Sequence, residues 1–198
     1  MREVLAVVEE ALLGSFVSAM ATLLGGLPVL LIRKMSERWK DILVAFTAGI
    51  MVSASTFGLL PQAIAEAGFW VMTVGLVLGV VVLDAIERNI PHIDVENKNG
   101  LRSLDNKTLL VMIALFIHNI PEGLSTGFSY ASGNAALGPM VAIAIGAQNM
   151  PEGLILAVFL LNARTPKPKA LFLVILTGLM EMVSAVIGYG TASYIDGL

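Results

Sequence analysis

Cysteine is absent from this sequence, and charged residues are scarce. Only 14% of its 198 residues are Asp, Glu, Lys or Arg, whereas a soluble domain carries about a quarter. Hydrophobic residues make up 57% and the mean hydropathy is +0.84, so the composition predicts a membrane protein. Without cysteine the chain can build neither a disulfide framework nor a thiolate site, so any metal must be bound by nitrogen and oxygen.

Other absences disfavour particular classes of function. A net formal charge of -3 indicates neither nucleic acid nor an acidic substrate as a partner. The sequence has no Gly-rich phosphate-binding loop, so an ATP-driven pump would need another subunit. The N-terminal segment carries Glu3, Glu9 and Glu10 and lacks the basic segment and cleavage site of a signal peptide. We therefore expect the first apolar segment to be retained.

Six apolar runs of about 20 residues could each cross a membrane. None alternates strictly between apolar and polar residues, so all six are predicted to be helices. They cover Ala11 to Ile32, Ile42 to Ala65, Ala67 to Leu83 extended toward Arg88, Leu109 to Ala131, Leu137 to Leu161, and Ala170 to Ile195. Close helix contacts are expected at Gly25 with Gly26, Gly75 with Gly79, and Gly188 with Gly190. The sequence thus predicts an all-α integral membrane protein with a single transmembrane domain over residues 1–198.

Lys and Arg gather in alternate loops between these runs. Eleven of the twelve basic residues lie in the first, third and fifth loops, and the remaining one is Arg2. Basic residues in short loops favour the cytoplasmic side. We therefore predict six spans with both ends outside, a cytoplasmic loop over residues 89–107, and a multi-pass location in the plasma or inner membrane.

Two related hexapeptides carry the acidic and imidazole side chains of the fourth and fifth runs. They read His118-Asn119-Ile120-Pro121-Glu122-Gly123 and, thirty residues on, Gln148-Asn149-Met150-Pro151-Glu152-Gly153. On a helix, the first residue and the Glu of each copy stand at i and i+4 and share one face. Proline removes a backbone hydrogen bond, so we expect each helix to kink beside the ligands and to free the carbonyls of Ile117 and Ala147.

A turn near Ser132, Gly133 and Asn134 would bring the two hexapeptides to the same depth, with His118 opposite Gln148. Glu181 lies about eleven residues into the sixth run, roughly 16 Å along a helix and therefore close to mid-bilayer. A charge at that depth costs roughly 2.5–3.5 kcal/mol, and no basic side chain is predicted there to balance it. Imidazole and carboxylate ligands suit Zn²⁺, Fe²⁺, Mn²⁺ or Cd²⁺. The sequence therefore predicts a divalent-metal site.

Several polar residues have two interpretations. Asn119 and Asn149 either coordinate the metal or hydrogen-bond its ligands. Glu181 is either a ligand or a nearby proton acceptor. Asp84 and Glu87, near Arg88 at the inner end of the third run, either line an exit or are ordinary interfacial charges. His92 and Asp94, in the third loop, form a weak candidate for metal capture on the cytoplasmic side.

The pair of hexapeptides closely resembles the fourth and fifth helices of the ZIP (Zrt/Irt-like protein) family of metal transporters, in particular its bacterial and GufA-like branch. The resemblance covers nearly the whole chain and extends to Ala48-Gly49-Ile50-Met51, Leu83-Asp84, Pro91-His92 and Gly178-Leu179-Met180-Glu181. It implies metal uptake toward the cytoplasm through a site in helices four, five and six, often binuclear. The implied ligands are His118, Glu122, Gln148, Glu152 and Glu181, with Asn119 and Asn149 serving the second metal.

The sequence departs from the family pattern in two respects. Some relatives carry Asp where Asn149 stands, and Asn lowers the negative charge of the site. Family members usually have eight spans, arranged as three, two and three, whereas six are predicted here.

Two functions stay open at this point. The first is a secondary transporter of Zn²⁺ or a similar ion. Such a transporter would be surrounded by membrane lipid, and a homodimer is one arrangement that it could adopt. The second is a metal-binding assembly partner, or a fragment, that does not transport. An intramembrane metalloprotease would need a second His one turn from the first, and that His is missing. We therefore expect no enzyme.

Overall fold

The computed structural model describes residues 2–31, 35–89 and 104–196, and within these ranges it contains helices and turns without strands. The elements are α1 (Arg2–Gly26), the 3₁₀-helix η1 (Leu27–Leu30), α2 (Glu37–Ala54), the π-helix η2 (Ser55–Leu59), α3 (Leu60–Asn89), α4 (Leu104–Ala131), α5 (Leu137–Asn162) and α6 (Lys167–Asp196). The all-α prediction is confirmed for these residues. Residues 90–103, with His92 and Asp94, lie outside the described ranges.

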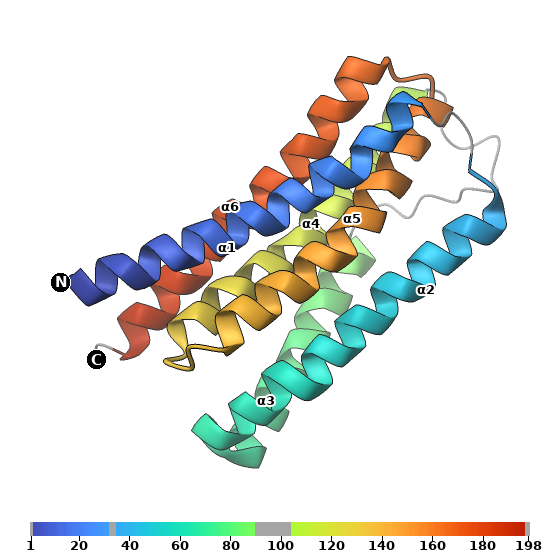
Figure 1. Ribbon diagram of the computed structural model, residues 1–198. Coiled ribbons are helices and arrows are strands. Elements are labelled where there is room, and N and C mark those ends of the chain that lie inside the picture. The colour runs from blue at the N-terminus through green and yellow to red at the C-terminus, as the bar shows by residue number, and fades with distance from the viewer. Residues whose placement is uncertain (1, 32–34, 90–103, 197–198) are drawn as a thin grey trace.

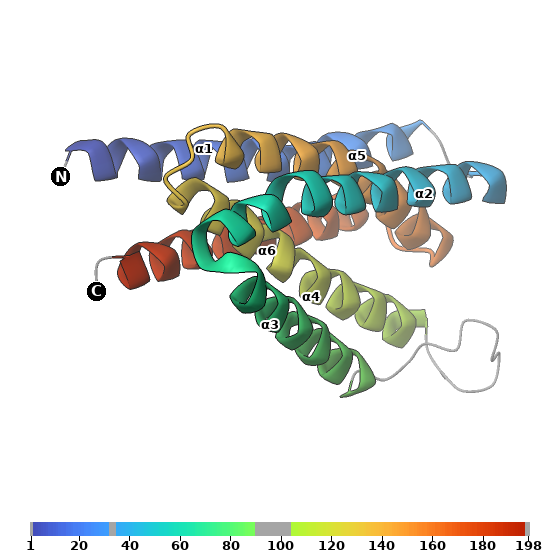
Figure 2. The same ribbon diagram turned by 90° about the horizontal axis from the view of Figure 1, so that it is seen from below.

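Five described segments are long and apolar enough to cross a membrane, as expected of a multi-pass membrane protein. One of them, Glu37–Ile86, is 50 residues long and contains two of the six predicted spans. Its helical geometry is interrupted at Gly68, where φ is 81° and ψ is 164°. Figures 1 and 2 show α2 and α3 as the two arms of a hairpin. The count of six spans stays a prediction.

Four helices form a bundle with α5 in its interior. The closest helix pairs are α4 with α6 and α1 with α5, and α2 packs on the far side of α5 (Figure 1). Half of the apolar window of α5 is buried, whereas none of the window in the α2–α3 segment is. The bundle therefore comprises α1, α4, α5 and α6, and the α2–α3 hairpin forms an outer arm.

Glycines permit the closest approaches between the bundle helices. A Cβ atom on Gly25 would overlap the carbonyl of Met150, and one on Gly188 would lie 2.7 Å from the carbonyl oxygen of Leu124. Small residues play this role in membrane helices, so the prediction is confirmed at these positions. It is wrong for Gly75, Gly79 and Gly190, where a Cβ would meet no atom of the described residues within 4 Å. Gly75 and Gly79 lie on the outer arm, away from the bundle.

The helix ends fall on two opposite sides of the bundle. The start of α1 and the end of α6 lie at the same end (Figure 1). At the other end lie the end of α5 and the starts of α2, α4 and α6. The described basic residues Arg38 and Lys40 are at the start of α2, and Lys167 and Lys169 are at the start of α6. Asp84 Oδ2 pairs with Arg88 Nε at 2.8 Å in an exposed ion pair, which favours the interfacial interpretation of this carboxylate.

Candidate metal-binding site

The hexapeptides lie in the middle of α4 and α5. Pro121 and Pro151 are both inside helices that continue on either side of them. The glycine that ends each hexapeptide faces another helix of the bundle: a Cβ on Gly123 would overlap the carbonyl of Glu181 in α6, and one on Gly153 would overlap the carbonyl of Thr22 in α1. The glycines thus place α6 and α1 directly beside the two motifs.

Three side chains of the hexapeptides converge. His118 Nε2 lies 3.6 Å from Glu122 Oε1 and 3.9 Å from Glu152 Oε1. One potential ligand atom from each of the three residues lies within 4.8 Å of the others, a spacing that a single metal ion can bridge. Gln148 Nε2 donates a hydrogen bond to Glu122 Oε1. We name His118, Glu122 and Glu152 the acidic–imidazole cluster.

The pairing of the two motifs is crossed. His118 meets Glu152, and Gln148 meets Glu122, so the first residue of each hexapeptide contacts the Glu of the other. His118 and Gln148, predicted to lie opposite each other, both lie beside Glu122 Oε1, and His118 also reaches Glu152 of the other hexapeptide. That the two residues lie at the same depth stays a prediction.

Burial and charge make this cluster a suitable cation site. Glu122 is 6% exposed, and its Oε2 atom is buried without a hydrogen-bond partner. A buried polar atom without a partner is costly. Among the described residues, no Lys or Arg lies within ion-pair distance of Glu122 or Glu152. A divalent cation would supply the missing partner and balance the two carboxylates.

The other three predicted site residues make hydrogen bonds outside the acidic–imidazole cluster. Both carboxylate oxygens of Glu181 are hydrogen-bonded, Oε1 to the Ser18 hydroxyl at 2.5 Å and Oε2 to Asn149 Nδ2 at 2.6 Å. Asn119 Nδ2 donates to the carbonyl of Thr177 at 2.9 Å. The structure therefore brings together His118, Glu122, Gln148 and Glu152, and it places Glu181, Asn119 and Asn149 in contacts of their own.

Ser18 is the residue that the sequence analysis missed. It lies in α1, far from both hexapeptides in the chain, and it is fully buried. A signal was present: Ser15, Ser18 and Thr22 interrupt an apolar run at helical spacing, and all three are buried. Hydroxyls on one face of a membrane helix indicate a face that contacts protein and not lipid.

A recess opens from the acidic–imidazole cluster between α2, α4 and α5. Its volume is about 530 Å³, and its lining includes His118, Glu152 and Thr47, with apolar residues from Val111 to Leu115 of α4 and Ile155 to Phe159 of α5. These residues lead from the cluster toward the start of α4 and the end of α5. The recess therefore connects the cluster with the end of the bundle where the basic loops are found.

In the opposite direction the bundle is packed. Beyond Glu122, Thr126 and Ser129 of α4 are buried, and so are Val141 and Ile145 of α5. The hydroxyl groups of Thr126 and Ser129 form hydrogen bonds within α4, where Thr126 donates to the carbonyl of Glu122 and Ser129 to that of Ser125. The cluster is thus open toward one end of the bundle and covered toward the other.

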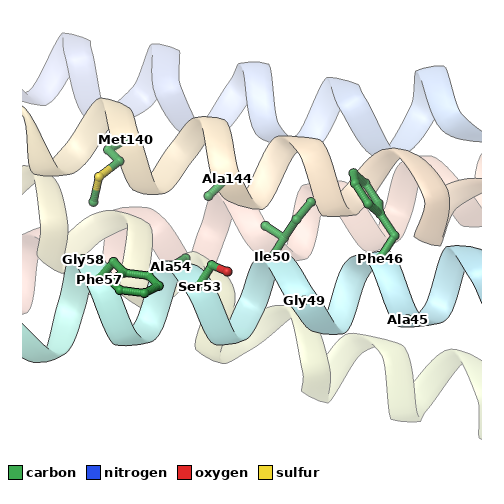
Figure 3. Close-up of a pocket in the computed structure, with 10 residues that line it drawn as sticks. All are labelled: Ala45, Phe46, Gly49, Ile50, Ser53, Ala54, Phe57, Gly58, Met140 and Ala144. Atoms are coloured by element: carbon green, nitrogen blue, oxygen red, sulfur yellow. The ribbon is translucent and has the colours of Figure 1, made fainter.

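A second recess lies between α5 and the segment formed by α2 and η2, nearer to the start of α5. It measures about 540 Å³, and Figure 3 shows its lining residues on α2 and η2 facing Met140 and Ala144 of α5. The lining is apolar apart from Ser53 and offers neither a carboxylate nor an imidazole. The two recesses leave α2 only loosely packed against α5.

Comparison with known proteins agrees with this arrangement. Residues 88–197, which include both hexapeptides and Glu181, match the family model described as ZIP Zinc transporter. The chain is 32% identical to "Zinc transporter ZIPB" of Bordetella bronchiseptica, over 92% of this chain and 63% of that protein. It is 33% identical to "Zinc transporter GufA" of Myxococcus xanthus, over 89% of this chain and 74% of that protein.

A similar match extends to "Zinc transporter ZupT" of Stenotrophomonas maltophilia, with 33% identity over 90% of this chain and 72% of that protein. The chain spans less than two thirds of the length of the Bordetella relative. The family match covers more than half of the chain, and it includes the helices that carry the acidic–imidazole cluster. This chain belongs to the ZIP zinc transporter family.

Proposed function

We propose that this chain carries Zn²⁺, or a similar ion such as Cd²⁺, Fe²⁺ or Mn²⁺, across the membrane through the acidic–imidazole cluster. One observation carries the proposal: the duplicated hexapeptides converge on Glu122, whose Oε1 lies beside His118 and Gln148 and whose buried Oε2 has no hydrogen-bond partner among the described residues. The names of the relatives as zinc transporters support zinc as the ion.

The proposed ligands are the imidazole of His118 and the carboxylates of Glu122 and Glu152. Two carboxylates balance a divalent ion, and nitrogen and oxygen ligands suit zinc. Gln148 orients Glu122 through its hydrogen bond and is a further predicted ligand. Three further residues stay predicted as ligands. They are Glu181 and, for a second metal, Asn119 and Asn149. Binding requires the ligands to be deprotonated, so zinc affinity should fall as the pH is lowered.

The recess supports a direction of release toward the cytoplasm. It links the cluster with the end of the bundle that carries the basic loops, and basic loops favour the cytoplasmic side. In a secondary transporter the site is reached alternately from each face, while parts of the protein move around it. We propose six spans with both ends outside, and an inward-open arrangement in which the ion is released from His118 and Glu152.

Zinc accumulation by proteoliposomes tests the proposal. A double variant, His118→Ala with Glu122→Ala, removes two of the three ligands and should abolish accumulation. Glu9→Gln is the matched control, because Glu9 is an exposed carboxylate of α1 outside the cluster. Accumulation that survives in the double variant would contradict transport through the cluster.

The alternative is a metal-binding assembly partner or fragment that does not transport. It is favoured by one observation, that the chain spans 63% of the length of the Bordetella relative. Zinc binding without accumulation by the unsubstituted chain would support it. Accumulation that requires His118 and Glu122 would exclude it.

A further inference from the structure

The Glu181 carboxylate is held by two neutral donors from two other helices. It is fully buried, with an exposed fraction of 0%. Ser18 of α1 donates to Oε1 at 2.5 Å, and Asn149 of α5 donates to Oε2 at 2.6 Å. Hydrogen bonds to a charged acceptor are among the stronger ones in proteins. The carboxylate is therefore fixed in orientation without a cationic side chain.

The same two donors also contact each other. Asn149 Nδ2 lies 3.2 Å from Ser18 Oγ and 3.3 Å from the Ser18 carbonyl oxygen. Among the described residues, neither Lys nor Arg forms an ion pair with Glu181. Ser18, Asn149 and Glu181 thus form a closed polar triad between α1, α5 and α6.

Two neighbouring residues of α5 donate hydrogen bonds to two different carboxylates. Gln148 donates to Glu122, which belongs to the acidic–imidazole cluster, and Asn149 donates to Glu181, which does not. Glu181 is nevertheless close, because its backbone carbonyl packs on Gly123, the residue after Glu122. We expect an ion in the cluster that recruits Glu181 to compete with Ser18 for the carboxylate.

We propose that Ser18 is a positioning residue of the metal site, which holds Glu181 on the α1 side and thereby limits the affinity for the ion. This inference rests on the proposed function. Loss of the Ser18 hydroxyl leaves a buried carboxylate oxygen without a donor, which destabilises the ion-free state. Because an ion that recruits Glu181 satisfies this oxygen again, zinc affinity rises, and we expect Ser18→Ala to raise it about tenfold.

Calorimetric titration of the purified full chain with Zn²⁺ tests the inference. Ser15→Ala is the matched control, because Ser15 is also fully buried in α1 and its hydroxyl donates to the Leu12 carbonyl of its own helix. Ser15→Ala should leave the affinity unchanged. Ser18→Thr keeps a hydroxyl and should restore the affinity of the unsubstituted chain. Ser18→Gly also removes the hydroxyl and introduces no metal ligand, so it should raise the affinity as well and provides a second test.

A double variant separates positioning from a general effect on packing. The gain from Ser18→Ala should vanish in the presence of Glu181→Gln, because the two residues act through one contact. A gain that persists in that background would overturn the inference, as would an affinity that is unchanged or lowered in both Ser18→Ala and Ser18→Gly. An unsubstituted chain that binds no zinc would contradict the proposed function itself, and the inference would fall with it.

Discussion

Two glycines of the hexapeptides allow neighbouring helices to reach the metal site. Gly123 packs on the backbone of α6 at Glu181, and Gly153 packs on the backbone of α1 at Thr22. Side chains at these positions would push the helices apart. The glycines therefore contribute to the site by allowing α6 and α1 to pack beside it, although they are not predicted to bind the metal themselves.

Gly123→Ala should destabilise the bundle and weaken zinc binding. Its Cβ atom would overlap the Glu181 carbonyl, and overpacking of this kind costs about 1–3 kcal/mol. Thermal unfolding in detergent measures the loss as a lower Tm. Gly190→Ala is the control, because a Cβ there meets no atom within 4 Å and alanine favours a helix. Equal Tm values for the Gly123→Ala and Gly190→Ala variants would contradict the close approach.

The sequence was sufficient to predict the residues of the cluster but not their pairing. His118, Glu122 and Glu152 were recognisable because helical periodicity within one segment fixes which side chains share a face. The contacts of His118 with Glu152 and of Gln148 with Glu122 depend on how α4 packs against α5, which local periodicity does not determine. The contact of Ser18 with Glu181 joins α1 to α6, so it depends on packing between helices that are far apart in the sequence.

At the scale of the elements, the α2–α3 hairpin is defined by one backbone conformation. The apolar runs predict a break between the second and third spans at Glu66, which lies between Ala65 and Ala67. The structure turns at Gly68, whose φ of 81° and ψ of 164° lie in a region that is essentially restricted to glycine. The π-helix η2 was not predicted, because π-helices have no clear periodic signal in the sequence.

Gly68→Ala should disturb the α2–α3 hairpin. Neither Gly68 nor Gly75 has a neighbour within 4 Å of a Cβ position, so space is not limiting at either residue. Backbone strain at Gly68 should cost about 1–3 kcal/mol, whereas Gly75→Ala, in the helical part of α3, should stabilise by about 0.5–1 kcal/mol. Chemical unfolding of the two variants measures the difference. Equal stabilities would contradict the turn at Gly68.

At the scale of the whole molecule, a bundle of four helices surrounds the site and an apolar hairpin lies outside it. Hydropathy predicted the all-α membrane class, because length and apolar composition alone indicate a spanning helix. Which helices pack together could not be predicted, since the apolar runs have similar compositions. Which helices pack against each other is determined by details such as the glycine contacts and the buried hydroxyl groups of α1.

The predicted orientation can be tested against a background free of cysteine. Ser132→Cys lies in the α4–α5 link and Thr165→Cys in the α5–α6 link, at opposite ends of the bundle. In intact cells, a membrane-impermeant maleimide should label Ser132→Cys and should reach Thr165→Cys only after the membrane is permeabilised. The reverse pattern would contradict the placement of both chain ends outside.

Zinc K-edge X-ray absorption of the zinc-loaded protein tests the central claim, that the two hexapeptides form one metal site. The chain has two histidines, His118 and His92, so imidazole scattering has few sources. We predict nitrogen and oxygen ligands at about 2.0–2.2 Å and an imidazole signal that His118→Ala removes and His92→Ala leaves unchanged. An imidazole signal that survives His118→Ala would contradict the claim.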